Sequence, residues 1–254
     1  MAVALSVNLN KIALLRNSRA GNFPDVLAFA RRGLELGVNG ITVHPRPDQR
    51  HIRAADSAPL ATLVKQYPRA EFNIEGNPFA ESLGDYPGFI PLVKSVKPHQ
   101  CTLVPDTNDQ LTSDHGFDLH RDGDRLLPIL QDLCVDNIRT SLFMDPDIEQ
   151  IRLAKEVGAD RIELYTGPYA AAYLEKSTQL DEIFAQFEQA AIYAQSIGLG
   201  VNAGHDLNLH NLPRFASIPG LLEVSIGHAL TIDALSKGWD TTIQAYLAIC
   251  QDTP

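Results

Sequence analysis

The chain is short of cysteine and of positive charge, and each shortage argues against a class of protein. Its 254 residues include three cysteines, at 101, 134 and 250. An odd number of widely spaced cysteines, without a CxxC or Cys/His pattern, indicates reduced structural thiols and neither a disulfide framework nor a metal site. Lys and Arg total 21 against 31 Asp and Glu, a net charge of −10, which argues against a nucleic-acid or anionic-membrane surface. Any anionic ligand must therefore be bound by a local cluster of basic groups.

Long apolar runs are missing as well. No segment approaches the roughly 18 apolar residues that cross a membrane, and residues 1–8 lack the basic region of a signal peptide. We therefore expect a buried first strand, no membrane partner and a cytoplasmic location. With 44% hydrophobic and 20% charged residues and no linker-like stretch, the composition is that of a globular protein, and we expect one domain over residues 1–254.

Short β-rich runs alternate with longer amphipathic stretches along the whole chain, which is typical of βα units and a parallel sheet. Eight strands are predicted, at residues 4–8, 40–44, 71–75, 100–104, 137–144, 161–166, 200–203 and 223–226. Helices are predicted to start at Pro24-Asp25 and end at Gly37, to run from Asp145-Pro146 to Gly158, and to run from Ser177 or Thr178 to Gly198. An additional short helix is expected within 167–199, and a long polar loop over 105–122.

Eight such units in about 250 residues favour a (β/α)8 TIM barrel with additional short helices over a doubly wound sheet. A barrel carries its chemistry at the carboxyl ends of the strands, whereas a doubly wound sheet gathers it at one switch point. Polar residues of catalytic type follow most of the predicted strands. The sequence therefore predicts a site at the barrel mouth.

The segment 40–52 is the clearest candidate for anion binding. An apolar strand delivers His44, Arg46, Arg50 and His51 into a proline-rich loop, where guanidinium groups can fork onto a phosphate and an imidazole can titrate near neutral pH. Because Pro45 biases His44 to an extended backbone, its side chain is expected at the rim. The alternative is a structural histidine bonded to a backbone carbonyl.

Two buried carboxylates are candidates for acid–base work. Glu75 ends the third strand, where burial would raise the pKa of its carboxyl and make it a general base; the alternative is a salt bridge to an arginine. Glu163 lies between apolar neighbours inside the sixth strand, so it points into the barrel and needs a partner. It could orient a histidine or a water, or pair with Lys11. Lys11 itself could bind phosphate, pair structurally or form a Schiff base.

A glycine precedes a histidine after the seventh strand (Gly204-His205) and after the eighth (Gly227-His228). Glycine allows close backbone approach, and the first amides of a following helix face an anion. Since barrels often bind phosphate with these two loops, the pair indicates a phosphorylated ligand; the alternative is two ordinary tight turns. The remaining histidines, at 99, 115, 120 and 210, are expected in surface or loop positions, and no metal is expected.

These motifs together resemble the PdxJ family of pyridoxine 5′-phosphate synthases over essentially the whole chain. The similarity rests on Val7-Asn8 with the segment 12–19, on 40–44 with Arg46 and 50–52, and on Asn73-Ile-Glu75, Leu103-Val-Pro105, Val201-Asn-Ala-Gly-His205 and Ile226-Gly-His228. The resemblance implies a (β/α)8 barrel, usually an octamer, that needs no cofactor. It implies condensation of 1-deoxy-D-xylulose 5-phosphate with 3-amino-2-oxopropyl phosphate, two small phosphorylated substrates.

The resemblance also implies roles for individual residues. His44 and Glu75 match the proton acceptors of the family, His205 its proton donor and Glu163 its transition-state stabiliser. The aminoketone phosphate would be held by Asn8, Arg19, Gly227 and His228, and the deoxyxylulose phosphate by Arg46, His51 and Thr112. Arg50 is expected to be structural.

Two substrate-binding positions depart from the family pattern. Many members have Asp-His where this chain has Asn10-Lys11, so the contact to deoxyxylulose phosphate must be rebuilt, and Lys11 could serve its phosphate or hydroxyls. The commoner glycine after the seventh-strand histidine is Asp206 here, and we expect its side chain to cap the following helix. A phosphate-binding barrel without turnover, and another phosphosugar aldolase or isomerase using Lys11, stay open as alternatives.

Overall fold

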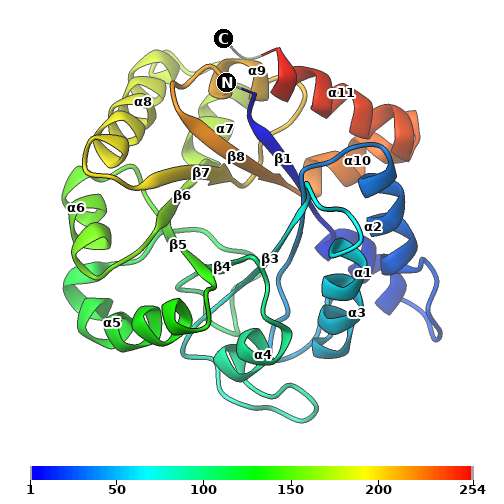
Figure 1. Cartoon of the computed structure of the whole chain (residues 1–254). Coiled ribbons are helices and arrows are strands. Elements are labelled where there is room, and N and C mark those ends of the chain that lie inside the picture. Colours follow the sequence, from blue (N-terminus) through cyan, green and yellow to red (C-terminus); the bar gives the residue numbers. More distant parts are fainter. Residues whose placement is uncertain (1, 253–254) are drawn as a thin grey trace.

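Eight parallel strands close into a barrel in chain order in the computed structural model, which describes residues 2–252 (Figure 1). Each strand pairs with the next, and β1 closes the barrel against β8. The strands are β1 Ala4–Asn8, β2 Gly40–Val43, β3 Glu71–Gly76, β4 Gln100–Leu103, β5 Arg139–Met144, β6 Arg161–Tyr165, β7 Gly200–Gly204 and β8 Leu221–Ile226. The predicted (β/α)8 barrel is therefore confirmed; residues 1, 253 and 254 of the predicted domain lie outside the described part.

A ring of helices surrounds the barrel (Figure 1). The helices are α1 Asn10–Asn17, α2 Val26–Glu35, α3 Ala54–Val64, α4 Phe89–Val96, α5 Leu119–Val135, α6 Ile148–Glu156, α7 Gly167–Leu174, α8 Leu180–Ser196, α9 Leu212–Phe215, α10 His228–Lys237 and α11 Trp239–Gln251. The additional short helix expected within 167–199 is α7. Within residues 2–252, no helix is both long and apolar enough to cross a membrane.

The predicted element ends differ from the observed ones by a few residues, for local reasons. The Asp25 carboxylate caps α2 by accepting the Leu27 N–H at 2.9 Å, so that helix starts after Pro24-Asp25. The α8 helix begins at Leu180, and neither Ser177 nor Thr178 caps it, since its N-cap residue is Gln179. The fifth strand starts two residues later than predicted because Asn137 takes a left-handed turn conformation with φ 57°.

Polar side chains fill much of the barrel interior. The Thr102 hydroxyl of β4 donates to Glu163 of β6 at 3.4 Å, and Asn202 of β7 donates to Gln100 of β4 at 3.3 Å. Because these strands are not neighbours, the contacts must run through the inside of the barrel. The apolar residues of the strands, such as the fully buried Phe72, belong instead to the hydrophobic core that the surrounding helices cover. The closed fold thereby carries buried carboxyl groups up to its mouth.

Candidate active site

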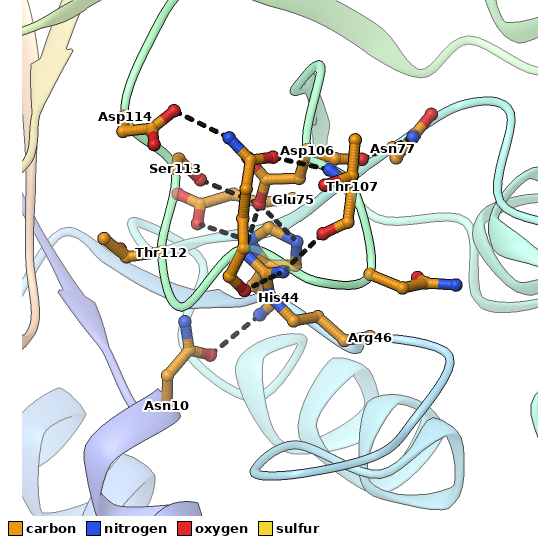
Figure 2. Close-up of polar contacts among 12 residues, drawn as sticks. Asn10, His44, Arg46, Glu75, Asn77, Asp106, Thr107, Thr112, Ser113 and Asp114 are labelled. Carbon is orange, nitrogen blue, oxygen red and sulfur yellow. Dashed lines mark hydrogen bonds and ion pairs between the residues drawn. The ribbon is translucent and has the colours of Figure 1, made fainter.

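The carboxyl ends of the strands gather the predicted site residues. His44 is the first residue after β2, Glu75 lies near the end of β3, Glu163 lies within β6 and His205 follows β7. Figure 2 shows the part of this site around His44, with Asn10 on one side and the loop between β4 and α5 on the other. His44 and Arg46 line a small pocket beside this part of the site.

His44 is a buried imidazole between two carboxylates. Its Nδ1 lies 3.9 Å from Glu75 Oε2, and its Nε2 lies 3.6 Å from Asp106 Oδ2. The His44 backbone N–H donates to Asn10 Oδ1 at 2.9 Å, which fixes the start of the loop. Burial lowers the pKa of His44 well below its usual value, and the charges of Arg46, His51 and Arg50 lower it further. The ring is therefore neutral at neutral pH and can accept a proton.

Glu75 shows the opposite shift. Its carboxyl accepts a hydrogen bond from Asn8 Nδ2 at 3.3 Å and one from the Ser225 hydroxyl at 3.4 Å. Burial raises the pKa of Glu75 well above its usual value, and the neighbouring carboxyls of Glu163 and Asp106 raise it further. Its salt-bridge partner within 4 Å is His44 and not an arginine, so the structural alternative of an arginine salt bridge is wrong for the described residues.

Glu163 is buried in the barrel with a mostly polar neighbourhood. It accepts a bond from Thr102, and burial together with the nearby Glu223 raises its pKa to about 8. A side chain on Gly204 would collide with the Glu163 carboxyl, which explains the glycine of the Gly-His pair. The alternative pairing with Lys11 is wrong, because none of the ion pairs among residues 2–252 involves Lys11.

His205 is held on both ring nitrogens. Its Nε2 lies 2.8 Å from the Thr112 hydroxyl, and its Nδ1 lies 2.8 Å from Asp206 Oδ2. The ring also packs edge-on against Tyr165, with centroids 5.3 Å apart. His205 and Asp206 both take positive φ, 90° and 58°, the region that favours glycine. Glycine would adopt this backbone without strain, whereas Asp206 holds it with a side chain.

The expected helix cap at Asp206 is wrong. The side chain of Asp206 binds His205, whereas the following turn is held by Asn208, whose Oδ1 accepts the backbone N–H groups of His210 and Asn211. The next helix, α9, begins only at Leu212 and has four residues. The seventh-strand Gly-His turn therefore does not present helix-start amides to an anion.

The eighth-strand turn does lie at a helix start. The α10 helix begins at His228, with Gly227 as its N-cap residue. A Cβ at Gly227 would lie 3.0 Å from Asn8 Cβ, so the glycine lets Asn8 pack against this turn. Only this member of the Gly-His pair thus has the geometry expected of an anion site at a helix N-terminus.

The two arginines of the 40–52 segment hold the loop between β4 and α5. Arg46 pairs with Asp106 and also donates to the backbone carbonyls of Thr107 and Gln110 at 3.3 and 3.2 Å. Arg50 donates to the carbonyls of Asn108 and Gln110, both within 2.8 Å. The long loop predicted over 105–122 ends at Asp118, the N-cap residue of α5, which begins at Leu119. Arg50 has the structural contacts expected of it, and Arg46 shares them.

A buried ion pair between Arg16 and Asp56 holds the rest of the 40–52 loop. His51 Nδ1 accepts the Ile52 N–H at 2.9 Å, and burial, followed by the charge of Arg46, lowers the pKa of His51 to about 3. The His51 carbonyl accepts from Arg16, which is 1% exposed and pairs with Asp56 at 2.7 Å. Arg19 lies exposed just beyond the end of α1.

The residue that sequence reasoning missed is Asp106. It is 4% exposed and contacts His44, Arg46 and Ser113. Its position in the sequence points to the site, because Pro105-Asp106 follows the fourth strand, and polar residues at strand ends are the ones expected at the barrel mouth. Thr112 of the same loop is among the predicted site residues, and its hydroxyl contacts His205 and not Asp106.

The other histidines lie in surface or loop positions, as predicted. His120 and His210 are exposed, His115 pairs with Asp114, and His99 accepts the Phe72 N–H. Throughout residues 2–252, no group of three His, Cys, Asp or Glu side chains is arranged to hold a metal ion.

The fold and the site together define a (β/α)8-barrel enzyme with acid–base groups at the carboxyl ends of its strands. A family model described as "Pyridoxal phosphate biosynthesis protein PdxJ" matches residues 5–252. The chain belongs to this PdxJ family.

Relatives with curated names span nearly the whole chain. A pyridoxine 5′-phosphate synthase of Xanthomonas campestris pv. campestris is 54% identical over 250 residues, which are 98% of this chain and 96% of that protein. One of Albidiferax ferrireducens is 50% identical over 248 residues, 97% of each chain. The solved 3-keto-L-gulonate-6-phosphate decarboxylase of Vibrio cholerae shares the fold alone, with a TM-score of 0.64, 12% identity and 98% of both chains covered.

Proposed function

We propose that this chain is a pyridoxine 5′-phosphate synthase, which condenses 1-deoxy-D-xylulose 5-phosphate with 3-amino-2-oxopropyl phosphate and releases inorganic phosphate and water. The observation that carries the proposal is the pair His44 and Glu75, 3.9 Å apart, whose pKa values are moved in opposite directions by burial. The curated relatives with this name support the proposal, because this chain matches them over nearly their whole length.

The reaction needs several proton transfers in one cavity. The amine of one substrate attacks the ketone of the other, and the resulting imine loses protons, phosphate and water before the ring becomes aromatic. Neutral His44 accepts a proton, and Glu75, whose pKa is raised, can accept one and return it. His205 donates a proton to a leaving hydroxyl. Glu163, with a pKa of about 8, stays protonated at neutral pH and donates a hydrogen bond to developing negative charge.

The two phosphates bind on opposite sides of the mouth in this proposal. The turn at Gly227-His228, with Asn8 packed beside it, holds the aminoketone phosphate, and Arg19 contributes charge. Arg46, His51 and Thr112 hold the deoxyxylulose phosphate, so Arg46 must exchange its contacts with the carbonyls of the β4–α5 loop for the ligand.

The Asn10-Lys11 and Asp206 positions mark a subgroup variation. Asn10 fixes the His44 backbone, Lys11 supplies a cation for the deoxyxylulose phosphate or its hydroxyls, and Asp206 binds the ring of His205. The enzyme needs no metal or cofactor in this scheme. A homo-oligomer and a cytoplasmic location stay predictions of the sequence.

Incubating the purified chain with both substrates, and with each alone, tests the function. Pyridoxine 5′-phosphate should form only when both are present, as followed by chromatography and mass spectrometry. Absence of product while either substrate binds would overturn the proposal and favour a binding barrel. Trapping of a Lys11 adduct by borohydride would favour an aldolase instead.

A further inference from the structure

The loop between β4 and α5 brings a third carboxylate, Asp106, against the proposed base. Figure 2 shows Asp106 beside the His44 ring, with Arg46 approaching the same carboxyl group. The Asp106 side chain is 4% exposed. It follows β4 directly, whereas Glu75 reaches the other ring nitrogen from β3.

One oxygen of Asp106 serves several partners. Oδ2 accepts a bond from the Ser113 hydroxyl at 2.9 Å, pairs with Arg46 and lies 3.6 Å from His44 Nε2. The second oxygen, Oδ1, is buried and has no hydrogen-bond partner within residues 2–252. The carboxylate therefore keeps the capacity to accept one more bond. Although burial raises the pKa of Asp106, the guanidinium of Arg46 and the Ser113 hydroxyl favour its charged form.

The charges around His44 make a nearby anion necessary for proton uptake. Three basic groups of the same loop, Arg46, Arg50 and His51, disfavour a positive charge on the His44 ring. Among residues 2–252, the carboxylates within 4 Å of the ring nitrogens are those of Glu75 on β3 and Asp106 after β4. Burial and the neighbouring carboxyls favour the neutral form of Glu75, whereas Arg46 and the Ser113 hydroxyl contact Asp106 directly. Asp106 is therefore the carboxylate placed to stabilise protonated His44. The 3.6 Å separation exceeds a hydrogen bond, and proton uptake by the ring would draw the two groups together.

We propose that Asp106 is a positioning residue of this enzyme: its carboxylate, set by Arg46 and Ser113, orients the His44 ring from the Nε2 side and stabilises its protonated form. The proposal rests on the proposed synthase function for its kinetic consequence, but its structural core does not depend on turnover. Asp106 touches no reacting atom and acts through His44.

The first test measures His44 directly, by NMR titration of protein with isotope-labelled histidine, with His44→Gln to assign the signal. In Asp106→Asn the pKa of His44 should fall by about one unit or more, because the nearest anion is gone. Asp106→Glu should retain most of the wild-type value. The matched control is Asp109→Asn, which removes an exposed carboxylate of the same loop. An unchanged His44 titration in a folded Asp106→Asn protein overturns the proposal.

The second test is kinetic. Asp106→Asn should lower kcat about tenfold or more with a smaller change in KM, and should move the acidic limb of the pH–rate profile to lower pH. Asp106→Glu should restore much of kcat, and Asp109→Asn should match the wild type. A loss confined to KM would assign Asp106 to the loop alone and overturn the proposal. If the wild type makes no product while the NMR shift is present, the synthase function fails and the positioning role stands.

Discussion

Replacing Glu163 by glutamine should stabilise the folded protein at alkaline pH. The ordinary glutamate pKa is 4.5 and the folded-state pKa of Glu163 is about 8. Below pH 4.5 the carboxyl is protonated in both folded and unfolded chains. Between pH 4.5 and 8 the unfolded chain loses this proton while the folded protein keeps it, so the free energy of unfolding falls as the pH rises.

The size of the effect follows from the same pKa difference. At 1.36 kcal/mol per pKa unit, the cost to the folded state reaches at most about 5 kcal/mol at and above pH 8. Glutamine has nearly the same shape, cannot ionise, and mimics the protonated carboxyl. The variant should therefore differ little from the wild type near pH 5 and exceed it in stability by a few kcal/mol at pH 8 to 9.

Denaturant unfolding at pH 5, 7 and 8.5, at one protein concentration, measures this difference. Glu71→Gln is the matched control, because the hydrogen bond from Arg139 holds the pKa of Glu71 below its usual value. Because Glu71 titrates below pH 5 in both the folded and the unfolded chain, the stability difference between that variant and the wild type should change little from pH 5 to 8.5. A stability difference for Glu163→Gln that does not change with pH would refute the buried, protonated state of Glu163.

Two further predictions concern residues outside the proposed bases. Asp56→Ala leaves the buried guanidinium of Arg16 without its carboxylate partner and should lower the free energy of unfolding by about 3 kcal/mol or more. The control Asp132→Ala breaks an exposed pair with Lys94 and should cost less than about 1 kcal/mol. Equal effects of the two variants in denaturant unfolding would contradict this prediction. Asp206→Asn keeps an acceptor for the His205 ring but removes the charge beside it, so kcat should fall with a smaller change in KM. An unchanged kcat would show that the Asp206 charge plays no part.

The barrel could be predicted from the sequence because its signals are local. Short apolar runs gave the eight strands within two or three residues, and the strand-end rule selected His44, Glu75 and His205. The sequence does not predict which element a given side chain contacts. Asp206 was expected to cap a helix, but the chain makes an Asn208 turn first, and its carboxylate is left beside His205.

Hydrophobic periodicity also does not predict the contacts between loops. Asp106 meets His44 because β2 and β4, which lie on either side of β3, end at the same mouth of the barrel. Along the chain, 60 residues separate Asp106 from its other partner, Arg46. Burial also had to be seen before protonation could be assigned. The sequence suggested that Glu75 would have a raised pKa, but the additional contributions of Glu163 and Asp106 depend on the closed barrel.

The central claim is that the acid–base groups at this barrel mouth close the pyridine ring, and the rate of pyridoxine 5′-phosphate formation from both substrates tests it most directly. The wild type should release one phosphate per ring formed, and His44→Ala should lose about 10²- to 10⁴-fold in turnover while substrate binding falls much less. A wild type that binds both substrates without forming product, or a His44→Ala variant with unchanged turnover, would contradict the claim.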